Sequence, residues 1–415
     1  MEARNHIDKD KKMKPTKLLI FLLILSGAPL SALAGKTAVP KSTPAERANG
    51  IAFSFYGRAA QDAGNVFFSP YSLHTAFSMT HEGAKGKTAA ELEKVFGFDK
   101  NKAAGRAGLE ALARELAAAA KGAEFAQANS FWAQQDYKFL PAYIKVLDKS
   151  YGAEAHPADF KTGAEAARRA INAWTDGKTK GKIKDLFAEG ALNALTRLVL
   201  VNAVYFKGAW ATAFPKNMTF DADFTLNSGA KIKAPLMTFS KNEELEYGEA
   251  GDTQLLRLPY KGGSLAMLVV LPKDAAALAA LEKSLNPETL GALRKALARQ
   301  KVKAFMPRFT FSSSFKLNDS LAALGMPLAF TDAADFSGMD GTKKLFIQTA
   351  VHKAFVEVNE EGTEAAAATG VAMGLKSMDF DFAMFRADRP FLFFIEDTKT
   401  GLLLFMGRME DPTKQ

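Results

Sequence analysis

Residues 359–377 read Asn359-Glu-Glu-Gly-Thr-Glu-Ala-Ala-Ala-Ala-Thr-Gly-Val-Ala-Met-Gly-Leu-Lys376-Ser377 and directly follow a strand-like run at 354–358. Alanine favours a helix here by intrinsic propensity, whereas the glycines interrupt a helix and the β-branched threonine and valine residues tolerate a strand. Composition therefore leaves the conformation of this segment open, and two different states are available to it.

In the extended state, side chains alternate between two faces of the segment. The face that begins at residue 363 is small and uncharged along its whole length, so it fits between existing strands without overpacking a core. If the segment stood alone, an exposed alanine-rich linker would be the competing interpretation. The two faces are Thr363, Ala365, Ala367 and Thr369 on one side, and Glu364, Ala366, Ala368 and Gly370 on the other.

Six further stretches follow one another between residues 65 and 408. They read Asn-Val-Phe-Phe-Ser-Pro-Tyr-Ser at 65–72, Gly-Ala-Lys-Gly-Lys-Thr at 83–88, Leu-Val-Asn-Ala-Val-Tyr-Phe-Lys-Gly-Ala-Trp at 200–210, Ala-Val-His-Lys-Ala at 350–354, Arg-Pro-Phe-Leu-Phe-Phe-Ile at 389–395 and Leu-Phe-Met-Gly-Arg at 404–408. With the segment at 359–377, these motifs resemble the serpins, a family of serine protease inhibitors, in the family's own order. The chain resembles an exported bacterial member.

The resemblance implies an α+β serpin fold with three β-sheets, about nine helices and an exposed C-terminal reactive-centre loop at about 360–386. The residue pattern agrees with a mixed fold. Apolar residues at three- and four-residue spacing indicate helices at 104–121 and 163–175, and strand-like runs lie at 197–206, 264–271 and 390–395. Helices come mainly early and strands mainly late, which favours α+β over alternating βαβ units. No linker divides residues 35–415, which we expect to form a single domain.

The N-terminal residues 1–34 have the pattern of a signal peptide. Lys14 and Lys17 precede an apolar run at 18–30, and Ala-Leu-Ala at 32–34 offers a cleavage site. The run is short for a spanning helix, which needs about 20 apolar residues, although an uncleaved anchor is the competing interpretation. Translation starts at Met1 or Met13. We therefore expect a protein secreted to the extracellular space or the periplasm.

The net charge and the distribution of basic residues limit the classes of binding partner that we expect. The formal charge is +9, and residues 1–34 contain six Lys/Arg and three Asp/Glu, which leaves +6 for the remainder. Basic residues at 100–106 and 178–182 make a polyanion, such as a sulfated polysaccharide, a weak candidate compared with a simple solvated surface. No aromatic interleaving or nucleic-acid motif accompanies them, so we expect no nucleic-acid partner. We also expect no membrane partner and a monomeric state.

The sequence shows no conventional active site. There is no cysteine, and the five histidines have no zinc-like spacing, so neither a thiol protease nor a metal site is expected. No Gly-x-Ser-x-Gly motif is present, and a phosphate-binding loop ending in Gly-Lys-Thr at 86–88 would need glycine where the chain has His81. We therefore expect no enzyme, no cofactor and no metal.

The resemblance implies a suicide-substrate inhibitor of serine endopeptidases, which traps an acyl-enzyme when its cleaved loop inserts into the central sheet. Counting along the hinge as the family does puts the scissile bond between Lys376 and Ser377, which suits a trypsin-like protease. The stretch 377–390 is about three residues longer than the family pattern, so Leu375-Lys376 and Met378-Asp379 stay open, with chymotrypsin-, elastase- or subtilisin-like targets. A noninhibitory serpin-fold binding or chaperone protein and an inhibitor of cysteine proteases stay open as well.

The resemblance also implies roles for residues outside the scissile bond. Four polar residues match a cluster beneath the central strands that controls sheet opening, Trp210 matches the aromatic residue where insertion begins, and Glu360 with Arg308 forms an ion pair that holds the hinge. The polar cluster is Ser69, Ser72, Asn202 and His352, and the hinge comprises Glu360, Gly362, Thr363, Glu364, Ala365, Ala366, Ala367, Ala368 and Thr369.

Overall fold

The structure is a computed structural model that describes residues 42–363 and 381–414. The predicted signal segment 1–34, the hinge residues 364–369 and the predicted bond between Lys376 and Ser377 lie outside the described residues. Helices and strands occur together in the unit that begins at Ser42, which confirms the predicted α+β class.

The described residues contain ten α-helical segments and four short 3₁₀ or π segments. They are α1 (Pro44–Ala59), α2 (Pro70–Gly83), α3 (Gly86–Phe96), α4 (Lys102–Ala119), α5 (Pro141–Val146), α6 (Phe160–Lys178), α7 (Leu278–Ser284), α8 (Pro287–Lys295), α9 (Leu317–Leu324), α10 (Ser337–Asp340), η1 (Leu147–Tyr151), η2 (Lys216–Met218), η3 (Ala275–Ala277) and η4 (Pro327–Phe330). Local sequence explains several starts: Thr43 and Glu46 form a capping box at α1, and Asp159 caps α6.

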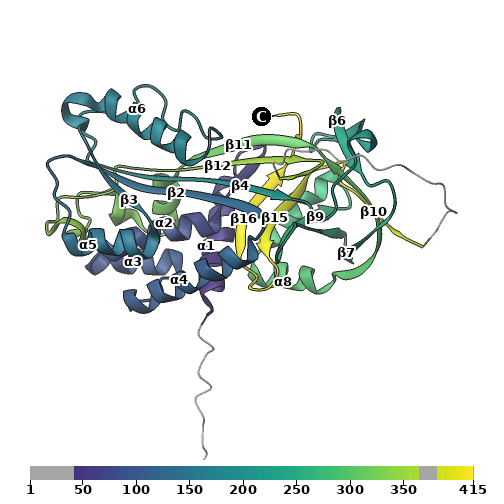
Figure 1. Ribbon diagram of the computed structural model, residues 1–415, viewed down its shortest axis with the longest axis horizontal. Helices are drawn as coiled ribbons and strands as arrows, with labels where there is room; N and C mark the ends of the chain where they lie inside the picture. The colour runs from purple at the N-terminus through teal and green to yellow at the C-terminus, as the bar shows by residue number, and fades with distance from the viewer. Residues whose placement is uncertain (1–41, 364–380, 415) are drawn as a thin grey trace, which may run out of the picture. The chain divides into compact units, whose positions relative to one another are not determined.

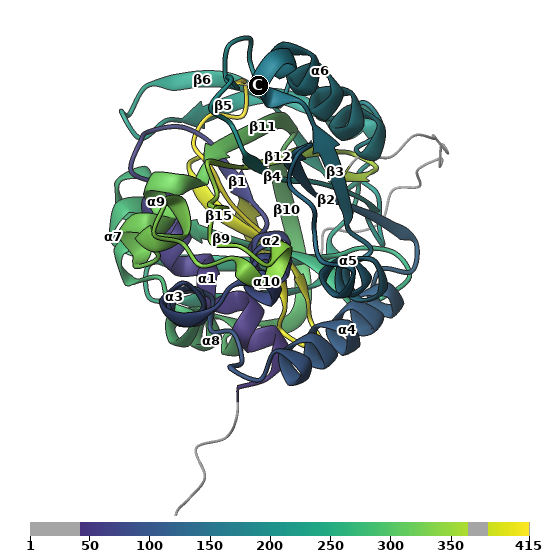
Figure 2. The same ribbon diagram turned by 90° about the vertical axis from the view of Figure 1, so that its left-hand side faces the viewer.

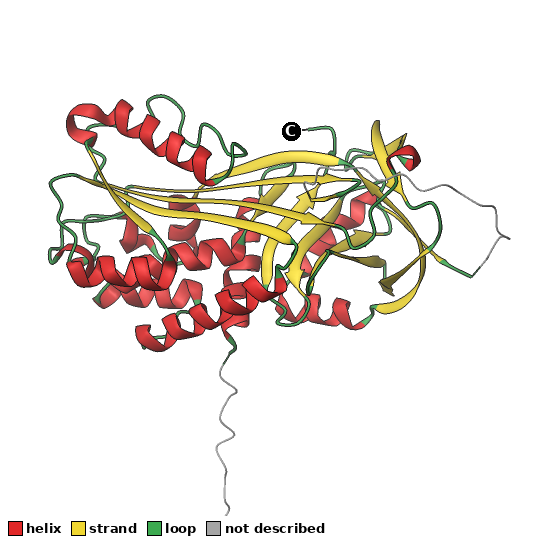
Figure 3. Ribbon diagram, in the orientation of Figure 1, coloured by secondary structure: helices red, strands yellow, loops and turns green. Residues whose placement is uncertain are grey.

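Strand pairing in the described residues produces two hydrogen-bonded sheets (Figure 3). The six-stranded sheet has the order β11 (Phe309–Lys316), β12 (Thr349–Asn359), β13 (Gly362–Thr363), β4 (Leu198–Ala209), β2 (Ala123–Gln134) and β3 (Glu154–Ala158). The ten-stranded sheet has the order β1 (Val66–Phe68), β16 (Leu403–Met409), β15 (Phe391–Asp397), β9 (Leu265–Pro272), β8 (Thr253–Pro259), β7 (Glu243–Ala250), β10 (Ala298–Pro307), β6 (Lys231–Thr238) and β5 (Phe220–Thr225), with β14 (Ala383–Arg386) paired to β10.

The larger sheet accounts for two of the three sheets that the family resemblance implies. Strand β10 joins them, because its residues 298–302 pair with β7 while residues 305–307 pair with β6. One long strand therefore connects two ladders that would otherwise be separate sheets.

Helices cover both faces of the six-stranded sheet (Figures 1 and 2). On one face lies α2, whose residues are almost all buried, with α1, α3 and α4 around it. On the opposite face, Ile171 and Ala167 of α6 share a buried apolar cluster with residues of three strands: Trp132 of β2, Val199 and Val201 of β4, and Val351 of β12. Helix α6 therefore covers this face of the sheet, and its backbone lies against β2.

The long periodic segments agree with the sequence-based predictions. The predicted helices at 104–121 and 163–175 correspond to α4 and α6, and the strand-like runs at 197–206, 264–271 and 390–395 correspond to β4, β9 and β15. None of the helices in residues 42–363 and 381–414 is long and apolar enough to cross a bilayer.

Candidate functional site

The centre of the candidate site is the seam where β12 and β4 pair in parallel. Seven residues of β12, 349–355, face residues 199–205 of β4. Strand β4 is mostly apolar and almost wholly buried, as expected for a parallel strand covered on two faces, whereas β12 alternates buried with half-buried residues after His352. Two polar side chains, His352 and Asn202, face each other directly across this seam and are both fully buried.

The chain returns to the same seam after β12 ends. It turns through Glu360 and Glu361, and Gly362 and Thr363 then form β13 between β12 and β4. Strand β13 is antiparallel to both neighbours. The described start of the predicted hinge is thus already part of the sheet, whereas the family resemblance implies an exposed loop that begins at about residue 360.

Gly362 is required by the close approach of the backbones. Its φ is 155°, and a Cβ atom added at this position would lie 2.1 Å from the carbonyl oxygen of Gly208 on β4. A larger residue would have to push β13 away from β4. The glycine therefore allows the first hinge residues to enter the sheet.

The four residues of the predicted polar cluster are brought together. The backbone N–H of Ser69 donates to Nε2 of His352 at 3.1 Å, so the opposite ring nitrogen, Nδ1, donates to Oδ1 of Asn202. Asn202 in turn donates to Oγ of Ser72 at 2.6 Å and to Asn129 on β2. Burial lowers the pKa of His352 to about 3 and keeps its ring neutral.

Ser69 has a structural role that the sequence pattern alone does not reveal. Its hydroxyl oxygen accepts from the backbone N–H of Ser72 at 3.0 Å and thereby caps α2. The same hydroxyl donates to the carbonyl of Leu404 on β16 at 2.5 Å. The network at the seam is consequently connected to the start of a buried helix and to the second sheet.

Trp210 lies at the other end of the seam, beside the hinge turn. Its indole Nε1 donates to the carbonyl of Asn359 at 3.0 Å, and its backbone N–H donates to the carbonyl of Glu361 at 3.0 Å. The backbone N–H of Phe214 donates to the carbonyl of Glu360 at 2.8 Å. These three bonds hold the turn between β12 and β13.

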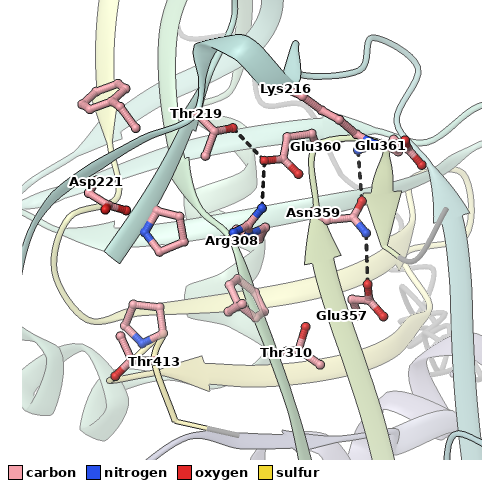
Figure 4. Close-up of a pocket in the computed structure, with 14 residues that line it drawn as sticks. Lys216, Thr219, Asp221, Arg308, Thr310, Glu357, Asn359, Glu360, Glu361 and Thr413 are labelled. Carbon is pink, nitrogen blue, oxygen red and sulfur yellow. Dashed lines mark hydrogen bonds and ion pairs between the residues drawn. The ribbon is translucent and has the colours of Figure 1, made fainter. Parts of the chain in front are cut away.

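A cavity of about 880 Å³ opens beside this turn (Figure 4). The carboxylate of Glu360, nearly buried, accepts from Thr219 at 2.7 Å and lies 3.4 Å from the guanidinium of Arg308. The predicted ion pair between Glu360 and Arg308 is present, but the hydrogen bond that the Thr219 hydroxyl donates to the same carboxylate is shorter. Lys216 contacts the next carboxylate, Glu361, at 2.7 Å.

Sequence reasoning missed several residues that position the hinge. Tyr260 lies in the turn after β8, and its phenol oxygen is 2.7 Å from the hydroxyl oxygen of Thr363. Asn359 accepts from the N–H groups of Glu361 and Gly362. An asparagine followed by a glycine three residues later is a turn signal that could have indicated this role, whereas no local signal connects Tyr260 to Thr363.

Metal ligands do not gather at this site. Across residues 42–363 and 381–414, no three His, Cys, Asp or Glu side chains lie where they could bind a metal ion. The polar side chains of the seam and the turn bond to one another and to backbone groups of the hinge.

Comparisons with known proteins agree on the family. The model of the family described as "Serpin (serine protease inhibitor)" matches residues 46–412. Leukocyte elastase inhibitor A of Rattus norvegicus is 40% identical over 359 residues, covering 84% of this chain and 93% of that protein. The structure of uncleaved ovalbumin aligns with a TM-score of 0.81 and 28% identity over 89% of this chain and all of the other. Human thyroxine-binding globulin, solved in complex with thyroxine, aligns with a TM-score of 0.81 and 27% identity over 90% of this chain and all of the other.

The chain belongs to the serpin family. The expectation of an exported protein is wrong, since the leukocyte elastase inhibitors of rat, mouse and human among its relatives point away from secretion. The comparisons likewise do not support an exported bacterial member of the family. The prediction depended on one short apolar run after two lysines, a pattern of low specificity that says nothing about the serpin domain.

Reversing the charge of Glu360 should open the seam. In Glu360→Lys a nearly buried ammonium group would replace the acceptor of Thr219 and face Arg308, at a cost of about 3 kcal/mol. We expect a lower melting temperature and oligomers on native gels after mild heating. Asp221→Lys makes the same charge change at an exposed residue of the same cavity and should behave like the wild type. A Glu360→Lys protein that stays monomeric with unchanged melting would exclude this role.

Acid should destabilise the fold well before the carboxylates titrate. Burial lowers the pKa of both His352 and His74 to about 3, from 6.5. Between pH 6.5 and 3 the unfolded chain binds more protons, so stability is complete above about pH 6.5 and falls as the pH drops. At pH 5 each histidine should cost about 2 kcal/mol, measurable as a shift of the urea midpoint between pH 7.5 and pH 5.

His74→Phe is the control for this pH effect. His74 packs edge-on against Phe98, and neither ring nitrogen has a hydrogen-bond partner within the described residues. The variant should keep the packing and lose about half of the pH dependence. An unchanged pH dependence would mean that these buried histidines do not set the acid sensitivity.

Proposed function

We propose that this serpin is a suicide-substrate inhibitor of serine endopeptidases. The observation that carries the proposal is the position of β13, because Gly362 and Thr363 already occupy the seam between β12 and β4 in the uncleaved chain. The leukocyte elastase inhibitors among the relatives support an inhibitory rather than a carrier role.

The chemistry follows from the fate of one peptide bond. A protease serine attacks the carbonyl of the scissile bond, the C-terminal part of the loop leaves as a new amine, and the N-terminal part stays attached as an acyl ester. The segment after Thr363 is then free to extend β13. Residues 363–376 span about 45 Å when extended, which carries the attached protease far along the sheet before water hydrolyses the ester.

The sheet itself favours insertion. In the uncleaved chain, β12 and β4 share a parallel ladder of seven residue pairs. A strand inserted in the direction of β13 would replace this ladder with two antiparallel ladders, and antiparallel pairing is slightly more stable per residue. Each inserted residue also gains backbone partners on both sides.

We propose Lys376-Ser377 as the scissile bond and a trypsin-like protease as the target. This assignment is taken from the sequence, since the bond lies outside the described residues. The elastase inhibitors among the relatives favour the neighbouring bonds, Leu375-Lys376 or Met378-Asp379, with an elastase-like target. The three bonds differ only in which loop residue precedes the cleaved bond, so identifying the cleavage point decides among them.

Mixing the protein with trypsin, and in parallel with elastase, tests the function and the bond together. We expect with trypsin a band at the summed mass that survives detergent, and a released peptide that begins at Ser377 by mass spectrometry. Lys376→Ala should abolish the trypsin band. A peptide beginning at Lys376 or Asp379, formed with elastase, would overturn the assigned bond and target. Cleavage by both enzymes without any stable band would contradict inhibition and favour a noninhibitory binding protein.

Replacing Thr363 with arginine should turn the inhibitor into a substrate. Thr363 is fully buried between β12 and β4, and an unpaired charge there is costly. We expect Thr363→Arg to be cleaved at the wild-type rate but to form no stable complex with the protease. Thr413→Arg makes the same substitution at an exposed threonine beside the hinge cavity and should still trap. Trapping by Thr363→Arg at the wild-type level would exclude loop insertion as the mechanism.

A further inference from the structure

A pair of buried hydroxyl groups joins the two sheets at the start of the hinge. The phenol oxygen of Tyr260 lies 2.7 Å from Oγ1 of Thr363, and either group can donate. Tyr260 follows β8 of the ten-stranded sheet, whereas Thr363 ends β13 of the six-stranded sheet. Both side chains are essentially inaccessible to solvent.

The tyrosine ring is held in place by contacts other than its hydrogen bond to Thr363. It stacks on Trp210 with 4.7 Å between ring centroids and meets Phe206 edge-on at 5.1 Å. Gly208 leaves room for it, since a Cβ atom there would lie 2.9 Å from the ring. The backbone of Tyr260 is fixed by a bridge to Trp210. The hydroxyl therefore has a fixed position against which Thr363 docks.

Withdrawal of β13 would leave this hydroxyl in a costly state. Burial raises the pKa of Tyr260 well above its usual value, so the group stays a neutral phenol that needs a hydrogen-bond partner. If Thr363 left the seam, the fixed phenol would remain in its apolar surroundings without that partner. The pair consequently biases the hinge toward the inserted state.

We propose that Tyr260 is a positioning residue that keeps the hinge docked, that is, with Gly362 and Thr363 paired between β12 and β4. Insertion then continues from Thr363 and does not have to begin by separating the two strands. This inference rests on the proposed function. After acylation, insertion competes with hydrolysis of the ester, and the rate of insertion scales with the fraction of molecules whose hinge is docked. Tyr260 thereby raises the share of encounters that end in a trapped protease.

Three variants isolate the hydroxyl pair. Tyr260→Phe removes one hydroxyl and keeps the stacked ring, and Thr363→Val removes the other and keeps the branched shape. In the double variant no buried hydroxyl is left unpaired, so its effect should be smaller than the sum of the two single effects. Tyr143→Phe is the matched control, because it removes a buried phenol that donates to the carbonyl of Met79 at 3.2 Å, away from the hinge.

Two measurements follow each variant: hydrogen exchange of the amides at 360–363 in the uncleaved protein, and the number of inhibitor molecules consumed per trypsin molecule trapped. For Tyr260→Phe we expect exchange about fivefold faster, the factor for one net hydrogen bond of about 1 kcal/mol. We expect trapping relative to hydrolysis to fall by a similar factor. Tyr143→Phe should match the wild type in both measurements even if its melting temperature drops.

Each outcome decides the proposal. Equal exchange in Tyr260→Phe and Tyr143→Phe would overturn the docking role, and faster exchange with unchanged trapping would overturn its effect on inhibition. Additive effects in the double variant would show that the two hydroxyls act separately, which also overturns it. If the wild type traps neither trypsin nor elastase, the proposed function fails, while the exchange measurement still decides whether Tyr260 docks the hinge.

Discussion

His352 and Asn202 meet across the parallel seam between β12 and β4, and any strand that enters the seam must separate them. Their hydrogen bond is one link of a buried network that continues to Ser69, which caps α2, and to Asn129 on β2. Because every member is buried, a broken link leaves polar groups without partners in a low-dielectric interior. The network therefore resists opening until new backbone bonds are supplied.

Strand β13 supplies such bonds at one end of the seam. Gly362 and Thr363 pair with both neighbours while the rest of the seam stays closed, so the uncleaved chain holds a short section of the inserted arrangement. Trp210 and Tyr260 fix this section from two directions, one through the backbone of the turn and the other through the Thr363 hydroxyl. In the proposed mechanism, the inserted sheet then differs from the present one only in how many residues β13 contains.

Scaffold and loop contribute separately to the proposed activity. The sheet, the polar network and the hinge are compatible with any target whose acyl ester lives long enough for insertion. In the proposed assignment, the residues around position 376 decide which protease attacks; the lysine there suits a trypsin-like enzyme, whereas the elastase inhibitors among the relatives favour an elastase-like one. Loops tolerate sequence change better than buried strands do, so such a scaffold can carry loops for different proteases.

The sequence by itself determined the α+β class, the long helices and strands, and the small uncharged face that begins at Thr363, because periodicity and side-chain size are local properties. It also pointed to Ser69, Ser72, Asn202, His352 and the pair of Glu360 with Arg308, through resemblance to a family. Only the tertiary structure decided that β13 is already in the seam, that Thr219 is the closer partner of Glu360, and that Tyr260 meets Thr363. These contacts join residues about 100 or more positions apart, and no local pattern encodes which distant side chain the folded sheets bring together.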